Sequence, residues 1–483
     1  MFRALGISAV TLPANAPPGA NAAGAVAASA RRAPSPAGTR VWGHARAFRR
    51  DPLGFLLSTA QTCGPVARLE LGPLTYHLVS DPVLIAEVLQ ARASNYLRDT
   101  RSSRTVRMVT GESLLTAEGA TWRHQRQAVQ PIFHHRNLMD LAKTMLTVAD
   151  EACAGWEQAA ATGTTLDLSA EMSRLAFAVA GRCLFGADLR DRADVVETAL
   201  PVLLEELFRR TSHVGNVPLW IPLPRHRAFQ RSLAAIDRVV GEVIAEHRRH
   251  SPATGVGAAD LLGLLMQTRH EGGAALSDNQ LRNQVVTFLL AGHETTANVL
   301  TWAFALLAKA PAESKKVQIE LDAVGFDAKR ATAVETLPAL ERLGAVLQET
   351  LRLYPSVWIL ERRAVANDDL GGWSIPRGSA VVVSPYVMHR LPERWEQPEN
   401  FRPERFLGGE TRTLLRDGYF PFGAGPHTCI GQHFALMEAK IVLATLLSRF
   451  RVTLIDGALP APLGGITLRP SAAVSIRVER RKA

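Results

Sequence analysis

The sequence is poor in cysteine and contains no long apolar run. Its 483 residues include only four cysteines, and their wide spacing excludes a disulfide framework. We therefore expect a reducing, cytoplasmic environment. No stretch of about 18 uncharged apolar residues occurs, so we expect no transmembrane segment. Apolar residues still make up 47% of the chain, which is enough to build a sizeable buried core.

Acidic residues are missing from the beginning of the chain, where the first one is Asp51. Residues 1–40 are mostly Ala, Gly and Pro, and Arg is the only charged type among them. Such a segment can bury too little apolar surface to order itself, so it predicts a disordered leader over 1–40. A cleaved signal is the alternative. From residue 41 the composition becomes ordinary, and we expect one domain over 41–483.

Two further absences bear on partners. No basic run is interleaved with aromatic residues, so the net charge of +10 is not taken to indicate nucleic-acid binding. No G-x-G-x-x-G unit marks an appended flavin or nicotinamide domain. A basic face that binds an acidic protein partner explains the charge at least as well.

The coarse structure is largely helical, with short β-like runs at 66–71, 75–79 and 380–384. The strongest helix starts at "SDNQ" (Ser277 to Gln280), a capping-box pattern, and continues to about Ala310. It is apolar on most sides, which predicts that it is buried. Its middle carries "AGHETT" (Ala291 to Thr296), and polar residues there are costly unless they are paired or functional.

One lone cysteine lies in a stiff loop, "FGAGPHTCIG" (Phe422 to Gly431), which is followed by the pattern of an amphipathic helix. A thiolate near a helix N-terminus is stabilised by the unpaired amides and the helix dipole. Cys429 could therefore be a nucleophile or a metal ligand. The alternatives are a buried free cysteine and a zinc site with His427 and His433, which lacks the usual paired spacing.

This loop resembles the heme-binding loop of cytochrome P-450 monooxygenases, usually written F-x-x-G-x-R-x-C-x-G. Other motifs agree in order and spacing, and the resemblance covers the chain from about residue 41 to the end. It implies the bacterial soluble type and the cytochrome P-450 fold: a single large domain, mainly α with small β-sheets. The further motifs are "WRHQR" (Trp122 to Arg126), "AGHETT", "ETLR" (Glu349 to Arg352) and "FRPERF" (Phe401 to Phe406).

The resemblance implies a heme b cofactor with Cys429 as its metal ligand. It also implies a set of residues that bind the cofactor. Within this set His427 stands where the family usually has arginine, and Arg362 is the alternative to Arg363. The set is Trp122, Arg126, Arg363, Phe422, His427, Cys429 and Gly431.

The resemblance assigns catalysis to Glu294 and Thr295, an acid and an alcohol that can relay protons at the oxygen site. The alternative is that Thr295 bonds its own helix backbone and that Thr296 carries the function. A buried structural triad is implied for Glu349, Arg352 and Arg405, against the alternative of an exposed ion pair.

The implied activity is insertion of one oxygen atom from O2 into a lipophilic small molecule, by hydroxylation or epoxidation. A fatty acid, a terpenoid or a polyketide would fit, which suggests secondary metabolism. Electrons must come from a separate ferredoxin or flavodoxin with its NAD(P)H reductase, and we expect a monomer. A peroxide-driven peroxygenase and a non-catalytic heme-binding protein remain as alternatives.

Overall fold

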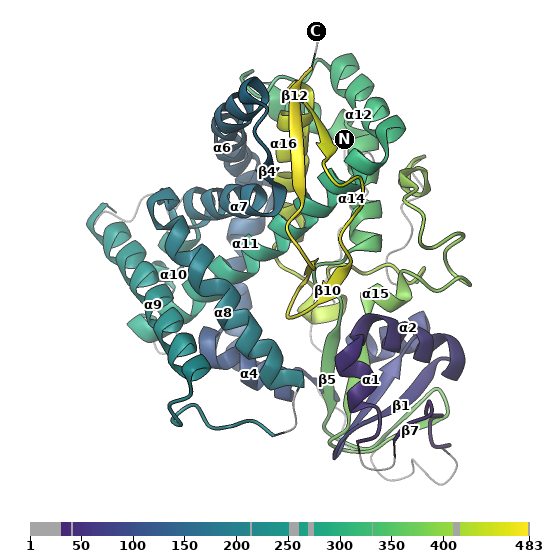
Figure 1. Ribbon diagram of the computed structural model, residues 1–483. Coiled ribbons are helices and arrows are strands. Elements are labelled where there is room, and N and C mark those ends of the chain that lie inside the picture. The colour runs from purple at the N-terminus through teal and green to yellow at the C-terminus, as the bar shows by residue number, and fades with distance from the viewer. Residues whose placement is uncertain are drawn as a thin grey trace. The chain divides into compact units, whose positions relative to one another are not determined.

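The computed structural model describes residues 30–39, 42–212, 215–250, 260–268, 275–330, 332–408 and 416–481. They form two compact units, each of which combines two stretches that are distant in the sequence (Figure 1). Unit 1 contains the described residues up to Thr100 together with Ile359–Thr428. Unit 2 contains Arg101–Trp358 and the described residues from Cys429 onward.

The last part of the predicted leader has defined partners in unit 1. The Arg31 N–H donates to the Gly372 carbonyl at 2.9 Å, and the Pro34 carbonyl accepts from the Arg68 N–H at 2.7 Å. Ala33 is buried. Residues 30–39 are therefore placed against unit 1, whereas residues 1–29 and 40 of the predicted leader lie outside the described residues.

Unit 1 is built on a five-stranded sheet of order β1-β2-β8-β5-β3. Strands β2 and β8 pair in parallel, and the other neighbours are antiparallel. The predicted β-like runs correspond to β1, β2 and β8, so these predictions are confirmed. The strands are β1 (Val66–Leu71), β2 (Leu74–Val79), β3 (Tyr96–Leu97), β5 (Leu360–Ala364) and β8 (Ala380–Val383), with a separate hairpin of β6 (Asp368–Leu370) and β7 (Trp373–Ile375).

The helices of unit 1 are short, and aromatic residues fix the segment that leads to the cysteine loop. The buried His389 accepts a hydrogen bond from the Phe420 N–H at 3.1 Å and packs against Tyr419 and Trp395. The Trp395 Nε1–H donates to the Met388 carbonyl at 3.0 Å. The helical elements are α1 (Ala45–Arg50), α2 (Pro52–Cys63), α3 (Pro82–Ala86), η2 (Glu87–Ala91), α15 (Pro385–Met388), η6 (Pro403–Phe406) and η7 (Gly425–His427).

Unit 2 holds the long helices and two small sheets. The sheets are β4-β12-β9 and β10-β11. The strands are β4 (Leu166–Asp167), β9 (Phe450–Leu454), β10 (Pro462–Gly464), β11 (Leu468–Pro470) and β12 (Ser475–Arg480). The helical elements are α4 (Arg101–Thr110), α5 (Gly119–Val129), η3 (Gln130–Phe133), α6 (His135–Thr162), α7 (Leu168–Phe185), η4 (Arg190–Arg192), α8 (Ala193–Ser212), α9 (Pro224–His250), α10 (Leu261–Gln267), α11 (Asp278–Lys309), α12 (Pro311–Val324), α13 (Ala333–Thr336), η5 (Leu337–Ala339), α14 (Glu341–Leu353) and α16 (Gln432–Arg449).

Helix α11 is the core of unit 2, as its apolar pattern predicted. The predicted capping box is present: the Ser277 hydroxyl accepts from the Gln280 N–H, and the Gln280 side chain accepts from the Ser277 N–H. Such a cap contributes about 1 kcal/mol. The helix packs against α7, α14 and α16, and the buried Trp302 stacks on Tyr354 with 3.8 Å between ring centroids. No described helix is long and apolar enough to cross a membrane.

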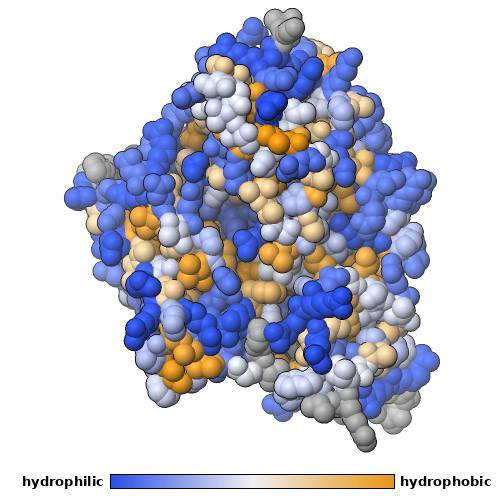
Figure 2. Space-filling view, in the orientation of Figure 1, coloured by the Kyte–Doolittle hydropathy of each residue, from blue (hydrophilic) through white to orange (hydrophobic). Residues whose placement is uncertain are grey.

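The connection between α8 and α9 is held by buried polar contacts rather than by apolar burial. Arg210 and Glu206 form a buried ion pair at 2.7 Å. Arg210 also donates to the Val217 carbonyl, and His226 Nδ1 bonds the Ile221 carbonyl at 2.8 Å. Trp220 remains 80% exposed. Figure 2 shows an apolar patch at the lower left, where Figure 1 shows this connection.

A buried charged pair fixes the C-terminal half of α14. Arg352 donates to both carboxylate oxygens of Glu349, from Nε at 2.7 Å and from Nη2 at 2.9 Å. Both side chains are fully buried. They are three positions apart, so they share one helix face. The two parallel bonds match the fork of the guanidinium. The predicted burial of these two residues is thus observed, and the exposed-pair alternative is wrong.

We predict that Glu349→Ala lowers the free energy of unfolding by about 3–5 kcal/mol, because it leaves the Arg352 charge buried without its carboxylate. Chemical denaturation of the variant and the parent measures this difference. The matched control is Glu335→Ala on α13, where the acid is exposed, and we expect a change within about 0.5 kcal/mol. A Glu349→Ala variant as stable as the control would contradict the structural role of the pair.

A second buried acid joins α16 to α11. Glu438 is 1% exposed and hydrogen-bonds the Thr296 side chain. Burial raises the pKa of Glu438 well above its ordinary 4.5, and the bond from Thr296 opposes this shift. The folded chain therefore binds this proton more tightly than the unfolded chain does. Stability is greatest below the unfolded pKa and falls as the pH rises through the folded one.

Glu438→Gln should remove this loss of stability at rising pH, because glutamine keeps hydrogen-bonding capacity but does not titrate. We expect the melting temperature of the variant, relative to the parent, to rise progressively as the pH increases from about 5 to 8. Melting curves across this range test the prediction, with Glu479→Gln at an exposed position as the control. A constant difference between variant and parent would show that Glu438 does not titrate in this way.

Candidate functional site

Cys429 lies two residues before the first turn of α16. Its sulfur accepts a hydrogen bond from the Gly431 N–H, and Arg126 of α5 is the charge that acts on it. Cys429 as a residue is exposed, whereas its sulfur atom is closely surrounded by protein atoms. Burial raises the pKa of the thiol, while the Gly431 N–H and the Arg126 charge lower it. These two groups favour the thiolate, as the loop position predicted.

The wall beside the sulfur is glycine and phenylalanine. A Cβ added to Gly431 would lie 4.0 Å from the Cys429 Sγ and 3.9 Å from the Phe133 ring. Phe133 in turn stacks on Phe288 of α11 and meets Phe434 of α16 edge-on. An apolar ring from η3 thus joins the two helices beside the sulfur.

The part of the cysteine loop that belongs to unit 1 is a tight turn. Gly425 has φ +73°, and a Cβ there would lie 1.9 Å from the Leu89 carbonyl oxygen. Only glycine allows η7 to approach η2 so closely. Phe422 and His427, both predicted to bind the cofactor, are half-buried in this turn.

Trp122 and Arg126 share one face of α5, as their spacing of four predicts. Both are half-buried. Burial lowers the pKa of Arg126, and the nearby Cys429 raises it. Of the predicted cofactor-binding residues in unit 2, Arg126, Cys429 and Gly431 are therefore brought together around one sulfur.

Arg363 lies on β5 in unit 1 and contacts Asp99 twice. Its Nε donates to the Asp99 carbonyl oxygen at 2.9 Å and its Nη2 to the carboxylate at 3.0 Å. The rival residue Arg362 is buried and donates to the Glu361 carbonyl. Successive side chains of a strand point to opposite faces, so the two arginines cannot serve the same side of β5.

The middle of α11 has one accessible face. Ala291 is exposed and Thr295 is half-buried, although most of the helix around them is buried. The Thr295 hydroxyl donates to the Ala291 carbonyl at 2.5 Å, which is the backbone bond that the sequence left open as an alternative. The oxygen of that hydroxyl keeps lone pairs that can accept a further bond. Thr296 is buried and bonds Glu438, so its side chain serves the packing of α16.

The two other polar residues of the motif are directed to different elements. His293 is buried, lies 2.8 Å from the Ser173 hydroxyl, and has its pKa lowered to about 4 by burial, so it is neutral at physiological pH. Glu294 accepts a hydrogen bond from the Thr467 hydroxyl at 2.6 Å. Burial raises the pKa of Glu294, while Thr467 and the Arg469 charge lower it. The acid is thus held by the β10–β11 hairpin.

The third predicted member of the structural triad lies in unit 1. Arg405 is on η6 and donates to the Gln397 carbonyl at 3.0 Å. Glu349 and Arg352 form their bidentate pair within unit 2. The pair is observed as predicted, and the part assigned to Arg405 stays a prediction.

Sequence reasoning missed Phe133, Ser356 and Thr467. The Ser356 hydroxyl donates to the Thr295 carbonyl at 2.8 Å, and Thr467 bonds Glu294 from 173 positions away in the chain. No short motif marks these residues.

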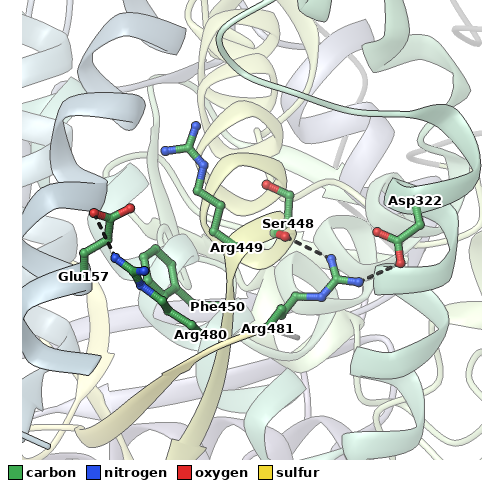
Figure 3. Close-up of a pocket in the computed structure, with 7 residues that line it drawn as sticks. All are labelled: Glu157, Asp322, Ser448, Arg449, Phe450, Arg480 and Arg481. Carbon is green, nitrogen blue, oxygen red and sulfur yellow. Dashed lines mark hydrogen bonds and ion pairs between the residues drawn. The ribbon is translucent and has the colours of Figure 1, made fainter. Parts of the chain in front are cut away.

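A polar pocket at the C-terminal end of α16 is separate from these residues (Figure 3). Its three arginines each pair with an acid: Arg480 with Glu157, Arg481 with Asp322, and Arg449 with Asp150. None of the predicted site residues lines it. Paired charges at a polar surface form no binding site for a lipophilic molecule.

The donors around Cys429 suit the cofactor that the resemblance implies. A cysteine sulfur with a backbone N–H and a guanidinium beside it can supply an anionic ligand and a cationic partner for a carboxylate. The Phe133 ring and the bare Gly431 form an apolar wall beside this sulfur, which suits an apolar ring. Among the described residues, no group of three His, Cys, Asp or Glu side chains is arranged to hold a metal, so the zinc alternative gains no support.

Comparison with known proteins identifies the family of the chain. The family model described as Cytochrome P450 matches residues 34–473. Cyclooctat-9-en-7-ol 5-monooxygenase of Streptomyces melanosporofaciens is 34% identical over 88% of this chain and 90% of its own length. Pentalenene oxygenase of Streptomyces avermitilis is 30% identical over 92% and 97%.

A plant protein is also similar over most of its length. LUTEIN DEFICIENT 5 of Arabidopsis thaliana, a chloroplastic protein, is 32% identical over 87% of this chain and 73% of its own length. A family match over nearly the whole sequence, together with relatives above 30% identity, confirms the predicted fold, heme cofactor and monooxygenase activity. The chain belongs to the cytochrome P450 family.

Proposed function

We propose that the protein oxygenates a cyclic terpenoid at a heme held by Cys429. The Streptomyces relatives named for cyclooctat-9-en-7-ol and pentalenene act on terpenoids, and they match nearly the full length of this chain. This favours a terpenoid over the fatty acid or polyketide that the sequence also allowed. The observation that carries the heme-thiolate proposal is the exposed Cys429, with the Gly431 N–H and the Arg126 charge beside its sulfur.

The residues around the cofactor have separable roles in this proposal. When bound, the heme supplies oxygen activation, which a thiolate ligand favours. Cys429 ligates the iron, and the Gly431 N–H and Arg126 favour the anionic state of its sulfur. Trp122, Arg126, His427 and Arg363 would hold the propionates, and Phe422 would lie against the ring.

Glu294 and Thr295 supply protons at the oxygen site. Thr295 lies on the accessible face of α11, and its hydroxyl oxygen can accept a proton-bearing group while its own proton bonds Ala291. In this proposal Glu294 is the acid that returns a proton to the site beside Thr295 through a water molecule. Burial keeps its pKa above the ordinary range, which suits an acid that both gives and takes protons.

The electron donor is an acidic ferredoxin or flavodoxin with its NAD(P)H reductase. The net charge of +10 favours association with an acidic partner. We propose a monomeric, cytoplasmic protein that meets this partner in solution. Peroxide-driven turnover is the second candidate, and the presence of both Glu294 and Thr295 argues against it.

We predict that Cys429→Ser abolishes the red-shifted Soret band of the reduced protein under carbon monoxide, because serine cannot supply a soft thiolate. Absorbance spectra of the purified variant and parent measure this. Cys63→Ser, at a half-buried thiol on α2, is the matched control and should keep the band. A Cys429→Ser variant that kept it would assign the ligand elsewhere.

We predict that Thr295→Ala still binds heme and substrate but loses about tenfold in product formed per NAD(P)H consumed, with peroxide released instead. Product, peroxide and cofactor are measured together with surrogate redox partners. Thr296→Ala is the paired control, and it should lower stability through Glu438 while coupling remains. Tight coupling in Thr295→Ala with uncoupling in Thr296→Ala would move the role by one residue. If both variants stayed coupled, the proton-relay proposal would be wrong.

A further inference from the structure

The tip of the β10–β11 hairpin reaches the acid of α11 through one hydroxyl. Thr467 is buried, and its Oγ1 donates to Glu294 Oε1 at 2.6 Å. The Asn298 side-chain N–H donates to the same Oγ1 at 3.2 Å. Because an amide nitrogen only donates, the Thr467 hydroxyl accepts from Asn298 and keeps its own proton for the Glu294 carboxylate. The two bonds form a chain that ends on Glu294.

The hairpin tip is itself held by the segment that follows α14. The Leu468 N–H donates to the Ser356 carbonyl at 2.9 Å, and Trp358 Nε1–H donates to the Gly465 carbonyl at 2.9 Å. The Ser356 hydroxyl then donates to the Thr295 carbonyl at 2.8 Å. The hairpin, this segment and α11 form a closed ring of hydrogen bonds, so Thr467 has little freedom to move away from Glu294.

We propose that Thr467 is a positioning residue that aims the Glu294 carboxyl and so sets how protons are supplied at the oxygen site. This inference rests on the proposed role of Glu294. Thr467 lies outside the "AGHETT" motif, on a hairpin, and is 173 positions from Glu294 in the sequence. The hydroxyl is well suited to the task because a bond to a carboxylate is about twice as strong as a neutral one.

Loss of the Thr467 hydroxyl has a defined electrostatic consequence. Burial favours the neutral form of Glu294, and the two groups that oppose it are the Thr467 hydroxyl and the Arg469 charge. Without the hydroxyl, the pKa of Glu294 rises further and its carboxyl can leave the hairpin. The pH at which coupling changes should therefore move upward, in addition to a loss of coupling at neutral pH.

The test compares Thr467→Val with Thr467→Ser in the holoenzyme, using ferredoxin and its reductase across pH 6–9. Valine keeps the shape and removes the hydroxyl. We expect coupling of NAD(P)H to product to fall about three- to tenfold, part of the roughly 10²–10⁴ that a positioned proton donor contributes. The midpoint of the pH profile should rise. Serine should restore both, and the carbon monoxide band should be unchanged in all variants.

Two further variants keep the test decisive. Thr301→Val removes a buried hydroxyl of α11 that bonds only the Ala297 carbonyl, and it should leave coupling intact. In a Glu294→Gln background, Thr467→Val should have no further effect, because Thr467 acts through that acid. Should Thr467→Val fail to retain heme, Thr467→Ala replaces it in the same comparison.

The outcomes separate this inference from the proposed function. Parent-like coupling and an unshifted pH profile in Thr467→Val would overturn the positioning role while the heme-thiolate band remained. An additive loss in the Glu294→Gln background would also overturn it. Absence of that band from the parent would instead overturn the proposed function itself.

Discussion

The proposed site depends on one constraint: the Cys429 sulfur must be kept as an anion. Burial raises the pKa of Cys429, and two protein groups lower it, the Gly431 N–H and the Arg126 charge. The start of α16 positions the amide, and α5 positions the guanidinium. The glycines of the loop follow from the same need, since the Gly425 turn admits no side chain. In the proposed holoprotein, a metal cation at the sulfur would complete the compensation.

Helix α11 is largely buried, and His293, Glu294 and Thr296 are each hydrogen-bonded to a different neighbouring element. His293 is bonded to Ser173 of α7, Thr296 to Glu438 of α16, and Glu294 to Thr467 of the hairpin. Their polar groups are thus paired within a helix that is otherwise apolar. Thr295 is half-buried beside the exposed Ala291. The helix can therefore be both the core of unit 2 and the wall of a reaction site.

Local signals in the sequence predicted those features that depend on neighbouring residues. The capping box at Ser277, the strands β1, β2 and β8, and the helix after Gly431 were all found, because each is encoded within a few positions. The contacts of Thr467 and Phe133 were not, because they depend on how distant segments pack. The backbone bond of Thr295 was left as an alternative, since spacing alone does not say where a helical hydroxyl turns.

The central claim is that the protein transfers one atom of O2 to a lipophilic substrate. Isotope labelling tests it most directly: the holoprotein converts a cyclic terpenoid under ¹⁸O₂ with ferredoxin, reductase and NAD(P)H. We expect product with one ¹⁸O atom and the second atom in water. Product whose oxygen came from labelled water would contradict it, as would a full heme-thiolate spectrum with no oxygenated product from any terpenoid, fatty acid or polyketide tried.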